Sequence, residues 1–281
     1  MIGRYAAATG ALVVDTFRES LSRKIFWGFF GCSTVLMLLF LLVLHIDIVE
    51  GGVAAVKIFG HDFNAGQGRE IGAVVNAVLG GVSVFLFTAG LFFSVFASAG
   101  LIPTIFEPGR IELLLSKPIS RPHLLLGKFL GTLAVIGCNL FYLVFGVWVI
   151  LGLKTDIWQA GFLASASLAV YAFAVLLTVV LFVAVISRSA VLATMVTYFV
   201  MLLSGIFSQH ENIGPYFNSQ WPRDLVTGLY YVFPKLPGIG DMARLAFLGR
   251  EIETWMPLVT SGVFAAVMLA ASVFVFRRKD Y

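Results

Sequence analysis

The sequence predicts an all-α protein that crosses a membrane six times. Apolar residues make up 59% of its 281 residues, charged residues make up only 12%, and the mean hydropathy is +0.96. Soluble domains are about 45–50% apolar and about 25% charged, so this composition excludes an ordinary soluble fold. A helix satisfies its own backbone hydrogen bonds, which lipid cannot do, and long apolar segments therefore cross a bilayer as helices.

An amphipathic helix is expected before the first span. Apolar side chains recur at three- and four-residue spacing at Val13, Val14, Phe17 and Leu21, and charged side chains lie between them. This pattern is typical of a helix in the membrane interface. The alternative is a polar tail whose periodicity is accidental. The first long apolar segment begins only near residue 25, so we expect no cleaved signal peptide.

Six segments are apolar for long enough to cross the bilayer. About 20 residues, rising ~1.5 Å each, cross the ~30 Å of hydrocarbon. The expected spans are residues 25–46, 73–98, 124–151, 161–186, 190–207 and 257–276. We expect a single transmembrane domain over residues 1–281. It comprises a cytoplasmic interfacial helix at 1–24, spans one to five at 25–207, an extracytoplasmic segment at 208–256, and span six with a cytoplasmic tail at 257–281.

The charges of the loops predict how the chain is inserted. With six spans, both termini and the loops after spans two and four lie on one side. That side carries twelve basic and five acidic residues, whereas the other carries seven basic and ten acidic residues. Because basic residues are enriched in cytoplasmic loops, we expect both termini in the cytoplasm and the protein in the cell (inner) membrane. Basic residues that flank spans in this way indicate a lipid bilayer as partner and no nucleic acid.

A short, rigid cytoplasmic helix is expected between spans two and three. Pro108 and Gly109 break the preceding span, residues 110–116 have room for about two turns, and Pro118 disfavours their continuation. Ser120 is suited to cap the next helix. A compact element held between two spans suits docking into a cleft on a cytoplasmic partner; the alternative is a merely solvated basic loop. The charged residues expected to face the partner are Glu107, Arg110, Glu112, Lys117 and Arg121.

The segment between spans five and six is rich in aromatic residues, which are interleaved with prolines and glycines. Short helices at 224–232 and 241–248, separated by a Pro-Lys-Leu-Pro-Gly turn, are expected to be extracytoplasmic or to re-enter the outer leaflet, where protein or water satisfies their ends. An ordinary folded extracellular cap is the alternative.

Two motifs and one helix resemble a known family. They are the run RIELLLSKPISRPHLLLGK from Arg110, the YYVFP sequence from Tyr230, and the amphipathic N-terminal helix. Together they resemble the type 2 ATP-binding-cassette (ABC) exporter permeases, and particularly the six-span branch that includes the nitrous oxide reductase maturation permease. The resemblance implies that residues 107–121 form the coupling helix that docks on a separate ATPase. It also implies that the N-terminal helix lies along the membrane beside that coupling helix.

The chain has no nucleotide-binding loop. The pattern G-x-x-x-x-G-K-[ST], whose backbone cradles phosphates, does not occur in the sequence. The resemblance therefore implies that ATP and Mg²⁺ bind a partner, a cytoplasmic ABC ATPase subunit, and that no cofactor binds this chain. It further implies that a second permease copy, in a homodimer or a related heterodimer, completes the substrate path.

Catalysis by this chain is not expected. H-E-x-x-H, G-x-S-x-G and a pair of intramembrane carboxylates are all absent from the sequence, so no catalytic residues are assigned. A metal site on the outer side is conceivable but not expected. It would draw on His45, Asp47, His61, Asp62, His210 and Glu211.

The sequence therefore favours a permease subunit that couples ATP hydrolysis by its partner to substrate movement, most simply export. The alternative is a non-transporting anchor or assembly subunit of a larger membrane complex. An ATP-independent channel or carrier is disfavoured, because Lys128 is the only charged residue inside an expected span and no inverted repeat is evident. Polar residues within the spans either line a path or pack helix on helix.

Overall fold

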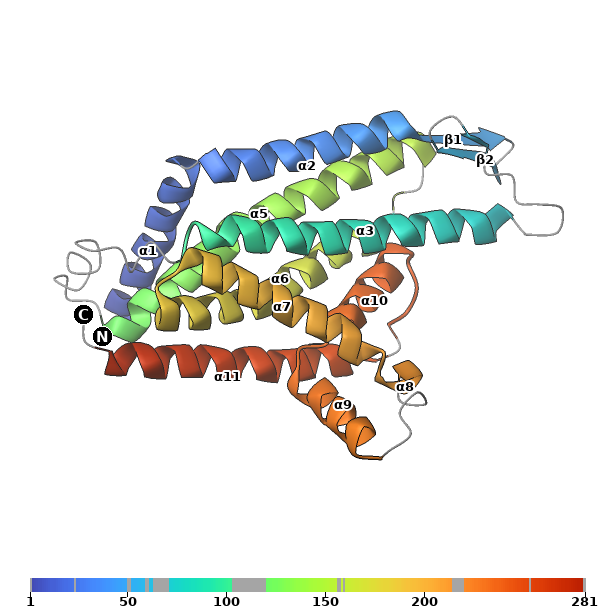
Figure 1. Ribbon diagram of the computed structural model, residues 1–281. Coiled ribbons are helices and arrows are strands. Elements are labelled where there is room, and N and C mark those ends of the chain that lie inside the picture. The colour runs from blue at the N-terminus through green and yellow to red at the C-terminus, as the bar shows by residue number, and fades with distance from the viewer. Residues whose placement is uncertain are drawn as a thin grey trace.

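The computed structural model describes residues 2–22, 24–49, 52–58, 61–62, 71–102, 120–155, 158, 160–213, 220–252 and 254–279. Each of the six expected spans is a helix, which confirms the all-α polytopic class (Figure 1). These helices are α2 (Lys24–Val43), α3 (Ile71–Ala99), α5 (Arg121–Thr155), α6 (Gly161–Ser187), α7 (Ala190–Ser208) and α11 (Met256–Arg278). Within the described residues, five of them can cross a membrane by length and composition alone, and α2 makes a sixth when it is paired with the preceding helix.

That preceding helix is α1 (Ile2–Ser22), and it forms the expected amphipathic N-terminal element. The chain bends by 72° between α1 and α2, so α1 slants across the end of the bundle (Figure 1). Its side toward the protein carries Thr16 and Ser20, which are buried, whereas Val14, Phe17 and Leu21 are exposed. An apolar face turned away from the protein is what a helix needs to rest in a membrane interface.

Helix α6 lies at the centre of the bundle. It packs against α3, α5, α7 and α11, and also against α10 (Leu236–Phe247). Two thirds of its span is buried (67%), compared with 11% of α11, so α6 forms the core and α11 an edge. A helix surrounded by other helices has no polar face, and α6 accordingly has no charged side chain between its ends.

The segment between α7 and α11 turns back into the protein. It contains α8 (His210–Ile213), α9 (Gln220–Val232) and α10, and the last two begin four or five residues earlier than expected. Ile239 of α10 is fully buried, and α10 packs on α6 and α3. The segment therefore packs on the helix bundle and is not a cap folded apart from it.

Two serines hold the turn between α9 and α10. The Ser204 hydroxyl of α7 donates a hydrogen bond to the carbonyl oxygen of Pro234 (2.6 Å) and accepts one from the backbone N–H of Leu236 (3.1 Å). The Ser261 hydroxyl of α11 accepts from the backbone N–H of Lys235 (2.9 Å). Broken helices are tolerated inside a membrane protein when neighbouring side chains satisfy the freed backbone groups in this way.

A small antiparallel sheet follows α2 and was not predicted. Its strands, in spatial order, are β1 (Leu44–Val49), β2 (Gly52–Ile58) and β3 (His61–Asp62). The first span was expected to continue to residue 46, but its helix ends at Val43. Ile46 and Ile48 alternate there with His45 and Asp47, which is the period-two pattern of a strand. The apolar run of α2 leads straight into this pattern and masks it.

We expect Gly161→Ala to destabilise the protein. Gly161 begins α6 where the end of α10 crosses it, and an added Cβ would overlap the carbonyl oxygen of Ala246. Because that atom is backbone, the helices must move apart, at a cost of about 1–3 kcal/mol. The measurement is the melting temperature of the purified protein in detergent. Gly205→Ala is the control, since a Cβ there has open space and should leave stability unchanged or raise it; equal melting temperatures for the two variants would contradict the packing of α6 on α10.

Candidate functional site

The start of α5 is the best candidate for a functional site, because the predicted coupling segment leads directly into it. Both ends of the described chain lie at this end of the bundle (Figure 1). Four charged residues from α1, α5 and the residue after α11 make cross-links here: Glu19, Arg121, Lys128 and Lys279. We call this cluster the terminal junction.

The first contact of the junction is the close packing of α1 on α5. Gly127 and Gly131 lie one turn apart on α5, and α1 places Leu12 against the first and Thr16 against the second. A Cβ on either glycine would lie only 2.7 Å from the α1 side chain. Small residues at four-residue spacing allow two helices to approach this closely in a membrane protein. The α1 helix is thus held against α5 along at least one full turn.

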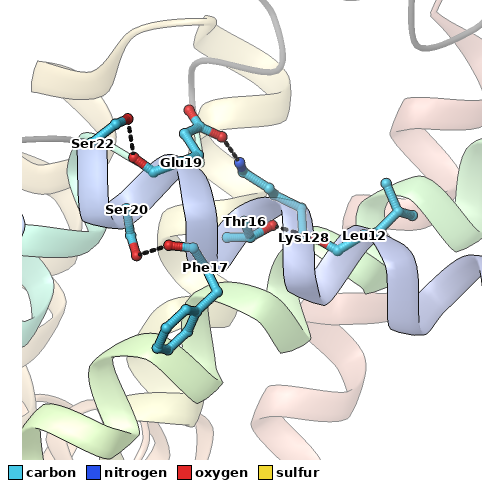
Figure 2. A network of polar contacts seen from close by, with 7 residues as sticks. All are labelled: Leu12, Thr16, Phe17, Glu19, Ser20, Ser22 and Lys128. Atoms are coloured by element: carbon cyan, nitrogen blue, oxygen red, sulfur yellow. Dashed lines mark hydrogen bonds and ion pairs between the residues drawn. The ribbon is translucent and has the colours of Figure 1, made fainter.

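A buried ion pair reinforces that packing. The Lys128 ammonium of α5 lies 2.5 Å from a carboxylate oxygen of Glu19 on α1, and their side chains are only 8% and 11% exposed (Figure 2). The Thr16 hydroxyl donates a hydrogen bond to the carbonyl oxygen of Leu12 on the same helix (2.8 Å), so it does not compete for either charge of the pair (Figure 2). Leaving one charge of such a pair buried without its partner is strongly unfavourable, so the pair resists separation of α1 from α5.

Arg121 and Lys279 connect α5 to the ends of α11 and α6. The Arg121 guanidinium donates a hydrogen bond to the carbonyl oxygen of Lys279 (2.6 Å). The Lys279 ammonium in turn donates to the carbonyl oxygens of Val185 (2.9 Å) and Ile186 (2.7 Å) in the last turn of α6. The last carbonyls of a helix have no partner within it and carry partial negative charge, so a cation is well placed there.

Of the five residues expected to contact a partner, the structure describes one. Glu107, Arg110, Glu112 and Lys117 lie outside the described residues. Arg121 is half-buried and bonds the end of α11. Ser120 directly precedes α5, as expected for a cap, and its hydroxyl contacts the His123 ring (2.5 Å between Oγ and Nδ1).

Sequence reasoning missed the Glu19–Lys128 pair. Lys128 was recognised as the only charge inside an expected span, and Glu19 was assigned to the charged face of the N-terminal helix. The two residues are 109 positions apart, and nothing in the spacing connects them. A lone lysine in an apolar helix does imply that an anion lies near it, and this is the signal from which the pair could have been suspected.

Polar residues inside the spans join helices to one another. Ser33 of α2 donates to the side-chain oxygen of Asn139 on α5 (2.8 Å), and Thr34 contacts the Tyr142 hydroxyl on the same two helices (3.2 Å). The Tyr198 hydroxyl of α7 donates to the carbonyl oxygen of Phe92 on α3 (2.8 Å). These contacts favour the packing alternative over a polar path for the residues concerned.

A second polar cluster lies at the opposite end, beside α9. The Lys235 side chain is buried, and its ammonium lies 4.2 Å from the ring centre of Tyr230 and 5.0 Å from that of Tyr231. Burial lowers the pKa of Lys235, and the nearby Tyr231 partly opposes this shift. His210 stacks on Tyr230. No group of three or more His, Cys, Asp or Glu side chains arranged to hold a metal occurs among the described residues.

Two comparisons with known proteins bear on this arrangement. A family model described as "ABC-2 family transporter protein" matches residues 11–281. The curated proteins contain no match. The matched region includes the second half of α1, from residue 11, together with the terminal junction and every span.

We expect Lys128→Met to destabilise the protein markedly, because it removes the ammonium that the largely buried Glu19 carboxylate contacts. Breaking a buried pair in this way costs on the order of 3–5 kcal/mol. The double variant Glu19→Leu/Lys128→Met removes both charges and should recover much of that loss. Thermal unfolding in detergent provides the measurement. Asp241→Asn, in an exposed pair whose partner Arg244 is 4.0 Å away, is the control and should cost less than about 1 kcal/mol. A double variant less stable than Lys128→Met would exclude the ion pair as the cause.

Because the Lys235 ammonium is buried, we expect the protein to gain stability as the pH becomes alkaline. Its folded pKa is below the unfolded value of 10.5, so the penalty for burying the charge is fully present below the folded pKa. The penalty disappears as pH rises from the folded pKa toward 10.5, because only the folded state has then released the proton. The melting temperature of the wild type should therefore rise relative to that of Lys235→Met between neutral pH and about pH 10. A constant difference between the two proteins would contradict this assignment.

Proposed function

The chain belongs to the ABC-2 family of transporter proteins, and from this premise we propose that it couples ATP hydrolysis by a separate cytoplasmic ATPase to movement of a substrate, in the direction of export. The coupling element is the segment that contains Glu107, Arg110, Glu112 and Lys117 and leads to Arg121. The observation that supports this role best is the terminal junction into which the segment leads.

The terminal junction is suited to pass a movement of the coupling segment on to several helices. A push on the first turn of α5 reaches α1 through the glycine contacts and the Glu19–Lys128 pair. The same push reaches α11 and α6 through Arg121 and Lys279. Packed helices shift as bodies and do not deform continuously. One docking segment can therefore move four helices together, which a solvated loop could not do.

The proposal places the terminal junction in the cytoplasm. Cations cluster at this end, where Arg188 ends α6 and Arg277 and Arg278 end α11. Basic residues next to the ends of spans are typical of the cytoplasmic side. An ATPase in the cytoplasm then meets the coupling segment directly.

The partner subunit supplies the chemistry. ATP and Mg²⁺ bind the ATPase, and this chain contributes no catalytic residue and no cofactor site of its own. A second permease copy, identical or related, completes the substrate path. The protein lies in the cell (inner) membrane with both termini in the cytoplasm.

The proposal predicts loss of the ATPase when the coupling segment is charge-reversed. Arg110→Glu with Glu112→Lys should reduce co-purification of the ATPase in mild detergent by about tenfold or more, because opposite charges at an interface are replaced by like ones. Arg121 is left intact, so its bond to Lys279 is kept. The matched control is Asp241→Lys with Arg244→Glu, an exposed pair at the opposite end of the bundle, and it should retain the ATPase.

Retention of the ATPase by the coupling-segment variant would contradict the proposed contact. A cysteine at position 112, in a chain whose Cys32 and Cys138 are replaced, should react only with a label supplied from the cytoplasm; reaction from outside would contradict the orientation. The anchor alternative predicts a complex that binds an ATPase but never accelerates hydrolysis in liposomes when candidate cargo is added.

A further inference from the structure

An open groove runs between α11 and the start of α5. It encloses about 720 Å³ and is walled by Leu126 of α5 and by Ala266, Ala270 and Phe274 of α11. Arg277 and Arg278 stand at its end. From Ala266 to Arg278, the helix rises about 18 Å, which is slightly more than one leaflet of the ~30 Å hydrocarbon layer. The groove is thus apolar, is about as long as one leaflet is thick, and has two cations at its mouth.

These two arginines differ from the other cations of the terminal junction. Arg121, Lys128 and Lys279 each donate to a carbonyl or carboxylate oxygen of the protein. Among the described residues, none accepts a hydrogen bond from Arg277 or Arg278, and both side chains are exposed. Arg278 lies over the Phe274 ring at 4.2 Å, which holds its guanidinium beside the groove. The mouth therefore presents positive charge that the described protein does not neutralise.

We propose that the groove binds one anionic phospholipid, with its phosphate held by Arg277 and Arg278 and one acyl chain along Ala266, Ala270 and Phe274. Guanidinium groups bind phosphate through paired, charge-assisted hydrogen bonds. Basic pockets between transmembrane helices bind acidic headgroups for this reason. The small side chains of Ala266 and Ala270 leave the space in which the acyl chain lies, and the apolar walls suit such a chain, which a free phosphate ion lacks.

Charge argues against a second copy of the chain as the occupant. In a two-fold symmetric contact the same surface faces itself, so the arginine pair of one copy would approach that of the other. Glu19, the acidic residue of the terminal junction, already pairs with Lys128. An anionic lipid neutralises the arginines without this conflict.

The test uses the full-length protein, stripped of lipid in detergent and mixed with equal amounts of phosphatidylglycerol and phosphatidylcholine of the same acyl chains. Native mass spectrometry then counts the lipids retained on each chain. We expect one phosphatidylglycerol per chain, held in preference to phosphatidylcholine, and not displaced by inorganic phosphate. Arg277→Gln/Arg278→Gln should weaken its retention about tenfold or more. Ala270→Trp keeps both arginines but fills the groove, and it should also lose the lipid.

Arg244→Gln/Arg250→Gln is the matched control, because it removes the same charge at the opposite end of the bundle, and it should retain the lipid. Circular dichroism and melting temperature establish that each variant is folded. Equal retention of both lipids, or no effect of the arginine variant, would overturn the proposal. So would retention of no lipid at all, which would indicate that protein covers the groove. If Ala270→Trp keeps the lipid but converts a dimer into a monomer, the occupant is a second copy. None of these results depends on the ATPase, so failure here leaves the proposed function untouched.

Discussion

The hydrocarbon of a bilayer offers no partner to a charge, and this constraint explains how the start of α5 is built. The Lys128 ammonium lies within the span, so Glu19 must come to it, and Glu19 can do so only because α1 lies directly on α5. The close approach requires Gly127 and Gly131, which leave room for Leu12 and Thr16. The position of α1 is thus fixed by shape and charge together, and the 72° bend before α2 follows from it.

The same constraint governs the ends of the other helices at this side of the bundle. Carbonyl groups at the end of α6 are satisfied by Lys279, and Lys279 is itself oriented by Arg121. Each cross-link supplies a partner that water or lipid would otherwise have to supply. A cluster formed to satisfy polar groups therefore also ties four helices to the segment that enters α5. Structural need and the proposed coupling role are met by the same atoms.

The spans were predictable because hydropathy acts on each segment independently of its neighbours. The expected 161–186 and 190–207 differ from α6 and α7 by one residue at their ends. Pairing between helices depends instead on complementary shapes, such as glycines that meet a leucine and a threonine of another helix, and a single sequence does not record which surfaces meet. The strand at Leu44–Val49 was missed because an apolar run without a break joins it to α2.

The candidate site was predictable only in part, for the same reason. The proline and glycine pattern around residues 108–118 and the position of Ser120 indicated where α5 begins, since these residues act locally on the backbone. The partner of Arg121 could not be foreseen, because Lys279 lies 158 residues away and contributes a backbone oxygen, which every residue has. The local sequence therefore predicts where α5 begins, whereas the contacts that α5 makes with other helices are known only once the bundle is packed.

The two serine hydroxyls at the turn before α10 determine how that turn would respond if α7 and α11 moved relative to each other. Ser204 belongs to α7 and Ser261 to α11, yet both hold consecutive residues of one short turn. Sliding either helix by one turn, about 5.4 Å, would pull one hydroxyl away from the peptide group that it now contacts. The hairpin of α9 and α10 would then travel with the helix whose hydroxyl stayed bound, so the position of this hairpin depends on which of the two helices has moved.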